Sequence, residues 1–129
     1  MMSKIRSKDT KPEKIVRSLM HSLGLRFRLH DSKLPGSPDL VMKKFRTVVY
    51  VHGCFWHSHP GCKYASKPKS NLDYWDGKLK NNVERDKLNQ KEITAMGWRS
   101  IILWECETKY MEMLQRKLET YFNQNNVIL

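Results

Sequence analysis

The hydrophobic and polar positions along the chain follow two periods, one typical of helices and one of strands. Between residues 10 and 23, apolar residues recur three or four positions apart, which predicts an amphipathic helix. Thr10 and Glu13 have the spacing of a capping box at its start, and Gly24 is placed to end it. Residues 25–30, LRFRLH, alternate strictly between apolar and basic side chains, which predicts a half-buried strand.

Three further apolar stretches have the length of strands. DLVM (39–42) and TVVYV (47–51) flank the polar turn KKFR, so they predict a hairpin that brings Asp39 opposite Tyr50 and Val51. WRSIILWE (98–105) is typical of a buried strand. A helix over residues 71–96, ended by Gly97, separates it from TVVYV, which predicts a right-handed crossover between parallel strands. An amphipathic helix over residues 107–123 completes the chain.

The predicted order α-β-β-β-α-β-α indicates an α/β fold, a small mixed β-sheet flanked by helices. We expect a single domain over residues 1–129, with residues 1–10 as a basic N-terminal arm. The apolar stretches are too short to span a membrane, and the start, MMSKIRSKDTK, lacks the apolar core of a secretory signal. These features predict a cytoplasmic protein.

The charge of the chain is strongly basic and unevenly spread. The formal net charge is +11 over 129 residues. Residues 1–50 carry 12 Lys and Arg against 4 acidic residues, whereas residues 91–129 carry 5 of each. A basic domain of this kind indicates a polyanionic partner, most often nucleic acid, and the alternative is a basic protein without such a partner.

The segment VHGCFWHSHPGC (51–62) concentrates residues that bind metals. Cys54, His59 and Cys62, with the distant Cys106, form a set of three cysteines and one histidine, a common environment for structural zinc. Cys106 follows the strand IILWE, so it can approach the segment from a neighbouring strand. The alternative is that Cys106 is a small buried apolar residue.

A second group of polar residues predicts hydrolytic chemistry beside this cluster. Asp39 begins a strand in GSPDLV, where a carboxylate can hold Mg²⁺, although the same residues also suit an ordinary turn. His52 and His57 flank the cysteine-containing loop and face Asp39 across the predicted hairpin. Histidine is a general acid or base near neutral pH, whereas a lone loop histidine is usually only solvated.

The aromatic residues divide into two groups. Phe55 and Trp56, joined by Trp75, are candidates for insertion between DNA bases, and the alternative is core packing. Core packing is the better explanation for Trp98 and Trp104, which lie within the last predicted strand.

Five motifs together resemble those of a known family. LPGSPDLV, VHGCFWHSHPGC, NVERD, MGWR and LWEC are similar to motifs of the very-short-patch-repair (Vsr) DNA mismatch endonucleases, and the similarity runs from about Met2 to Tyr121. The resemblance implies a restriction-endonuclease-like fold with a structural zinc site. It also implies a bacterial, DNA-associated monomer that nicks double-stranded DNA 5′ of the T in a T·G mismatch. Such mismatches arise by deamination of 5-methylcytosine, and the nick initiates very short patch repair.

The resemblance also implies a role for individual residues. Asp39 and the backbone carbonyl of Val51 correspond to the ligands of the catalytic Mg²⁺, and His57 corresponds to the catalytic histidine. His52 and Asp86 correspond to a supporting pair, and Glu13 to an acidic residue near the site. The implied DNA-intercalating residues are Phe55, Trp56 and Trp75, and the implied zinc ligands are Cys54, His59, Cys62 and Cys106.

Three features depart from the usual family pattern. HSHPGC is one residue longer between His59 and Cys62, so His57 and His59 both remain candidates for zinc. The basic arm is short. The acidic-x-Lys motif of many nucleases with this fold is absent from YVHGC, which fits the histidine-based variant. Two alternatives stay open, a non-catalytic zinc-containing DNA-binding module and a nicking enzyme with another mismatch or sequence preference. A requirement for mismatch-repair proteins is also open.

Overall fold

The computed structural model describes residues 10–66 and 69–125, with the side chains of residues 123–125 left out. The predicted N-terminal arm, apart from Thr10, lies outside the described residues. The helices are α1 (Lys11–Ser22), α2 (Leu72–Ala95) and α3 (Met111–Asn125), and the strands are β1 (Arg28–Leu29), β2 (Leu40–Met42), β3 (Thr47–His52) and β4 (Arg99–Trp104). Within the described residues, the connections contain the short 3-10 helices η2 (Lys43–Phe45), η3 (Lys63–Ala65) and η4 (Glu105–Lys109). The predicted order of helices and strands is confirmed.

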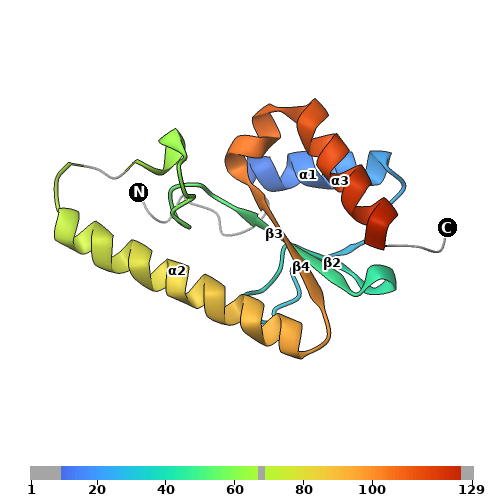
Figure 1. Cartoon of the computed structure of the whole chain (residues 1–129), viewed down its shortest axis with the longest axis horizontal. Helices are drawn as coiled ribbons and strands as arrows, with labels where there is room; N and C mark the ends of the chain where they lie inside the picture. Colours follow the sequence, from blue (N-terminus) through green and yellow to red (C-terminus); the bar gives the residue numbers. More distant parts are fainter. Residues whose placement is uncertain (1–9, 67–68, 126–129) are drawn as a thin grey trace.

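The strands form one mixed sheet in the order β1-β2-β3-β4. β2 and β3 are antiparallel with Leu40 opposite Val49, and β3 and β4 are parallel, as the crossover through α2 predicted. The Asp39 amide donates to the Val49 carbonyl oxygen at 2.9 Å, so Asp39 lies beside Tyr50 and Val51 as expected. Figure 1 shows α1 and α3 together on one face of the sheet and α2 across the other face.

The larger core lies between the sheet and the pair α1 and α3. It is built from one apolar face of each element, with Val16, Leu19, Met20, Leu40, Met42, Val49, Ile101, Leu103, Leu114, Leu118 and Phe122 buried together. A smaller core under α2 holds Val41, Val48, Tyr50 and Ile93. α2 has 24 residues, of which only Leu79 and Ile93 are buried, so most of this helix is available to form a surface.

Two predicted elements differ from the structure. Only Arg28 and Leu29 of LRFRLH form a strand, and Leu29 is 43% exposed, because β1 is an edge strand and the chain turns at His30 (φ +49°). The last helix begins at Met111 and not at residue 107, since the preceding residues form η4. Met113 of α3 is exposed to solvent, and Phe122 is buried in the core.

Leu103 provides a direct test of the larger core. Its side chain is fully buried on β4, so Leu103→Ala leaves a cavity and should lower the free energy of unfolding by about 2–5 kcal/mol. Met113→Ala is the matched control, because Met113 is 69% exposed, and it should change the free energy by less than about 0.5 kcal/mol. Urea denaturation measures both. Equal effects of the two substitutions would contradict the core described above.

Candidate active site

A cavity of about 540 Å³ opens between the sheet, residues 30–39 and α2. Asp39, His52, His57 and Asp86, which the sequence marked as candidates, all line it. The cavity also exposes His30, which sequence reasoning did not select. All five residues carry ionisable side chains, so the fold concentrates proton-transfer and metal-binding groups at one place.

Asp39 lies at the entrance to β2, where the hairpin register fixes its side chain. Its carboxylate accepts a hydrogen bond of 2.6 Å from the backbone amide of Val51. Burial raises the pKa of Asp39 to about 7, the Val51 hydrogen bond acts in the opposite direction, and the negative charge of Glu13 adds to the increase. Near neutral pH this carboxylate therefore favours either a proton or a cation. The carbonyl of Val51 as a metal ligand stays a prediction.

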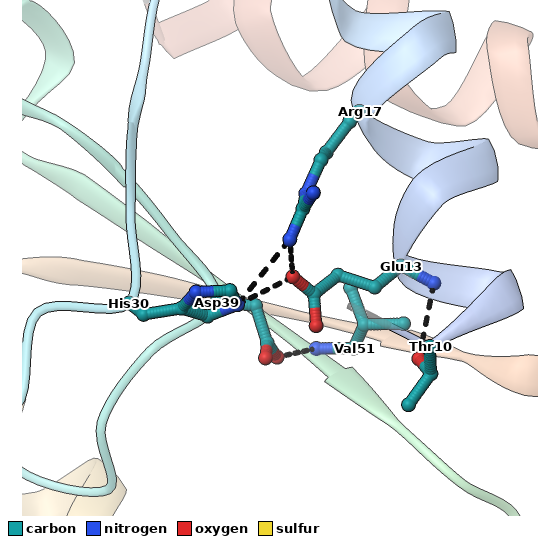
Figure 2. A network of polar contacts seen from close by, with 6 residues as sticks. All are labelled: Thr10, Glu13, Arg17, His30, Asp39 and Val51. Carbon is teal, nitrogen blue, oxygen red and sulfur yellow. Dashed lines mark hydrogen bonds and ion pairs between the residues drawn. The ribbon is translucent and has the colours of Figure 1, made fainter. Parts of the chain in front are cut away.

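Glu13 reaches the site from the first turn of α1, whose start is capped by the Thr10 side chain. Its side chain is almost fully buried and forms an ion pair with Arg17. The imidazole Nε2 of His30 lies 2.5 Å from the Glu13 carboxylate. Figure 2 shows these two side chains in contact beside Asp39. Glu13, His30 and Asp39 each offer a ligand atom, and these atoms all lie within 4.8 Å of one another. Two carboxylates and one imidazole fit a divalent cation.

His57 is held by Asp86 from the middle of α2. Its Nδ1 lies 2.6 Å from the Asp86 carboxylate. A carboxylate at Nδ1 favours the tautomer that carries its proton there, which leaves Nε2 to accept a proton. The predicted supporting pair of His52 and Asp86 therefore takes a specific form, in which Asp86 bonds to His57 and His52 stacks on the His57 ring with 3.7 Å between ring centres.

His52 is kept neutral by its surroundings. Burial, together with the neighbouring His57, lowers the pKa of His52 to about 4, while Asp86 acts in the opposite direction. Its Nδ1 is buried and has no hydrogen-bond partner among the described residues. A neutral ring beside His57 adds no positive charge to the cavity, and the unpaired nitrogen is available to a water or a ligand.

A second group of metal-binding side chains lies on the loop that follows β3 and on η4. Cys54, His59, Cys62 and Cys106 offer ligand atoms that are all within 4.8 Å of one another. The three cysteines are free of disulfides, and the Cys106 sulfur lies 3.5 Å from Nδ1 of His59. The structure therefore places His59, and not His57, beside the cysteines. Three sulfurs and one imidazole fit a zinc ion with four protein ligands.

The pairing of β3 with β4 explains how Cys106 reaches the cluster. His52 lies opposite Trp104, so Cys54 and Cys106 each follow a paired residue by two positions. The Cys106 amide donates to the Cys54 sulfur at 3.4 Å. The chain from Cys54 to His59 forms a closed turn, in which the His59 amide donates to the Cys54 carbonyl oxygen at 2.9 Å.

The candidate DNA-intercalating rings lie together, with Phe55 and Trp56 on the loop after β3 and Trp75 on α2. The ring centres of Phe55, Trp56 and Trp75 are 5.1–5.9 Å apart, and all three side chains are half-buried. Asn82 donates to the Trp56 carbonyl oxygen at 3.1 Å, which ties the loop to α2. The helical repeat places Trp75, Asn82 and Asp86 on one face of α2.

The two remaining tryptophans have different surroundings. Trp98 packs against the smaller core, as predicted. Trp104 is half-buried and lies in neither core. Its ring stacks on His59 at 4.0 Å between centres and meets the His52 ring edge-on at 5.3 Å. The core prediction for Trp104 is therefore wrong, and this ring lies between the cysteine cluster and the histidine pair.

Comparisons with known proteins identify the family of the chain. The family described as DNA mismatch endonuclease Vsr matches residues 1–63. The type II nicking enzyme V.XorIIP of Xanthomonas oryzae is 49% identical over 118 residues, 92% of this chain and 86% of the relative. The DNA mismatch endonuclease Vsr of Escherichia coli is 41% identical over 113 residues, 88% of this chain and 72% of the relative.

A solved structure supports the fold. The catalytic domain of the homing endonuclease I-Bth0305I aligns with a TM-score of 0.64 and 18% sequence identity, covering 91% of this chain and 98% of that domain. This likeness supports the restriction-endonuclease-like fold. None of the helices among the described residues is long and apolar enough to cross a membrane. From the family match and the extent of identity with its relatives, the chain belongs to the Vsr family of DNA mismatch endonucleases.

Proposed function

We propose that this DNA endonuclease nicks double-stranded DNA on the 5′ side of the thymine in a T·G mismatch and so initiates very short patch repair. Membership of the family and the nuclease fold support a nicking endonuclease that acts on DNA. The observation that carries the proposal is the meeting of Asp39 with the His57–Asp86 pair in one cavity. This arrangement combines a cation-binding carboxylate with a proton acceptor of fixed orientation.

DNA binding follows from the charge of the chain and from the aromatic cluster. The net charge of +11 favours contact with the phosphate backbone and makes affinity depend on salt. The rings of Phe55, Trp56 and Trp75 are the wedge that enters the duplex beside the mismatch. Unstacking a mismatched base pair costs less free energy than unstacking a Watson–Crick pair, so insertion of these rings favours the mismatch.

His57 performs the proton transfer in the proposed reaction. Asp86 holds its Nδ1, so Nε2 takes a proton from the water that attacks the scissile phosphate. His52 stacks on His57 and limits the rotation of its ring. Attack forms a new P–O bond and breaks the bond to the 3′ oxygen, which leaves a 3′ hydroxyl and a 5′ phosphate.

Asp39 is the residue that would hold the catalytic Mg²⁺, with the Val51 carbonyl as a second ligand and Glu13 nearby. When bound there, the cation supplies charge neutralisation at the phosphate and favours ionisation of water. The position of Asp39 in the wall of the cavity, with ligand atoms of Glu13 and His30 within 4.8 Å, supports this assignment.

Zinc is the proposed occupant of the second ligand group. Cys54, His59, Cys62 and Cys106 would hold it as a structural ion, since four protein ligands leave no position for substrate. Phe55, Trp56 and His57 lie between Cys54 and His59 in the chain, and Trp75 packs on Phe55 from α2. A metal at the cluster therefore fixes both the wedge and the proton acceptor. We propose that the protein acts as a monomer on its DNA.

Replacing Asp39 tests the proposed catalytic role. Asp39→Asn keeps the size of the side chain and removes its charge, so single-turnover nicking of a T·G duplex in Mg²⁺ should fall at least about a hundredfold. Binding of the duplex should change by less than about threefold, because phosphate contacts elsewhere dominate affinity. Glu119→Gln on the exposed surface of α3 is the matched control and should nick normally. Undiminished nicking by Asp39→Asn would show that Asp39 holds no essential cation.

The raised pKa of Asp39 predicts a pH dependence of stability. The folded protein binds more protons at this group than the unfolded chain between its ordinary pKa of 3.8 and about 7, so this contribution to stability is lost as pH rises through that window. The free energy of unfolding of Asp39→Asn, relative to that of the unsubstituted protein, should therefore increase from pH 5 to pH 7 and level off by pH 8. Urea titrations of zinc-loaded protein without Mg²⁺ measure the difference. A difference that does not vary with pH contradicts the shifted pKa.

The zinc assignment predicts a linked loss of metal and loop order. Cys106→Ser removes a thiolate ligand from η4, so bound zinc, measured by elemental mass spectrometry, should fall from about one ion per chain to well below one. Limited proteolysis should then cut within residues 53–62. Thr108→Ser on the same 3-10 helix is the control. A stable, fully active Cys106→Ser protein without zinc would refute the structural role.

A further inference from the structure

The cation site at Asp39 contains an imidazole that the sequence analysis did not select. His30 lies directly after β1, and Figure 2 shows its ring beside the carboxylates of Glu13 and Asp39. The nearest ligand atoms of Glu13, His30 and Asp39 are all within 4.8 Å of one another. Opposite ligands of one Mg²⁺-sized ion are about 4.2 Å apart, so small side-chain shifts bring all three to a shared ion.

The backbone fixes the position of His30. Its amide donates to the Asp39 carbonyl oxygen at 3.1 Å. Its φ of +49° is a left-handed backbone conformation that residues other than glycine adopt less often. This turn directs the imidazole toward α1, where Nε2 lies 2.5 Å from the Glu13 carboxylate. The strained turn and the amide hydrogen bond hold the ring at the cavity wall.

Glu13 and Asp39 place two carboxylates beside the His30 imidazole, an arrangement that favours binding of a divalent cation. Glu13 is 1% exposed and interacts with Arg17, whose guanidinium also lies 3.4 Å from Nε2 of His30. The Asp39 carboxylate lies beside that of Glu13 and accepts a hydrogen bond of 2.6 Å from the Val51 amide, so two carboxylates meet at one wall of the cavity. A divalent ion adds the missing charge and replaces the contact between His30 and Glu13.

We propose that Glu13, His30 and Asp39 form a mixed nitrogen and oxygen site that binds a first-row transition metal, with Mn²⁺ as the probe, more tightly than Mg²⁺. The inference rests on the proposed function, in which Asp39 holds the catalytic cation. Mg²⁺ prefers oxygen ligands and keeps most of its water, whereas transition-metal ions accept imidazole readily. A fixed imidazole beside two carboxylates therefore selects against Mg²⁺.

Mn²⁺ also separates this site from the cysteine cluster. Soft thiolates select zinc, and Mn²⁺ favours carboxylates and water, so zinc-loaded protein leaves the Asp39 site as the place for added Mn²⁺. Electron paramagnetic resonance of free Mn²⁺ gives its dissociation constant without reference to activity. Competition by Mg²⁺ then gives the second constant on the same sample.

The decisive variant is His30→Gln, which keeps a polar side chain and removes the imidazole. Mn²⁺ should bind the unsubstituted protein about tenfold or more tightly than Mg²⁺, and His30→Gln should lose most of that ratio. His21→Gln is the matched control, because His21 is an exposed histidine that stacks on Phe27 outside the cavity. The ratio of single-turnover nicking rates in Mn²⁺ and Mg²⁺ should fall in His30→Gln and stay constant in His21→Gln.

The outcomes distinguish this inference from the proposed function. If His30→Gln is folded by circular dichroism and keeps the Mn²⁺-to-Mg²⁺ binding ratio, His30 only supports Glu13 and the inference is wrong, while Mg²⁺-dependent nicking would leave the proposed function intact. If Asp39→Asn binds Mn²⁺ as tightly as the unsubstituted protein, no cation is held at Asp39 and both fail. Loss of the ratio in His30→Gln alone supports the mixed site.

Discussion

The parallel pairing of β3 with β4 is the interaction on which the rest of the site depends. Its register sets His52 opposite Trp104 and so brings Cys54 and Cys106 together just beyond the sheet. The loop that starts at Gly53 is then closed by His59, and its chain carries the aromatic rings and His57. A shift of this register by one residue would turn every side chain to the other face and would separate the two cysteines.

α2 extends this arrangement away from the sheet. Trp75 and Asp86 are eleven residues apart, which is about 16 Å along a helix. One end of the helix therefore supports the aromatic cluster, and its middle holds His57 through Asp86. Because α2 buries few of its own residues, its contacts with the loop also decide where the helix lies. The loop after β3 and helix α2 therefore fix both the aromatic wedge and the proton acceptor His57.

The cavity combines these positions with unfavourable electrostatics. The half-buried carboxylate of Asp39 lies beside the buried carboxylate of Glu13, and His52 is held neutral with an unpaired ring nitrogen. Such groups lower the stability of the protein on its own and are relieved when a cation, a water or a phosphate binds. The larger core between the sheet, α1 and α3 lies on the other side of the sheet and supplies stability that the cavity lacks.

Much of this site could be predicted from local sequence. The hairpin periodicity placed Asp39 beside Val51, and cysteine and histidine spacing identified the cluster that the structure assembles. His30 could not be found in this way, since the alternation of LRFRLH gives only its face, and its orientation comes from a left-handed turn. Trp104 was misassigned because its strand is apolar by pattern, while its actual neighbours are the rings of His52 and His59.

The measurement that tests the central claim most directly is the position of the nick. Each strand of a duplex with a single T·G mismatch is labelled in turn and compared with its fully paired form, in Mg²⁺ and in EDTA, with purified protein alone. We predict one Mg²⁺-dependent nick, on the strand that carries the mismatched thymine, immediately on its 5′ side and with a 5′ phosphate. Tight binding of zinc-loaded protein without any nick would contradict the account and favour a non-catalytic DNA-binding module. Equal cleavage of the paired duplex would contradict recognition of the mismatch.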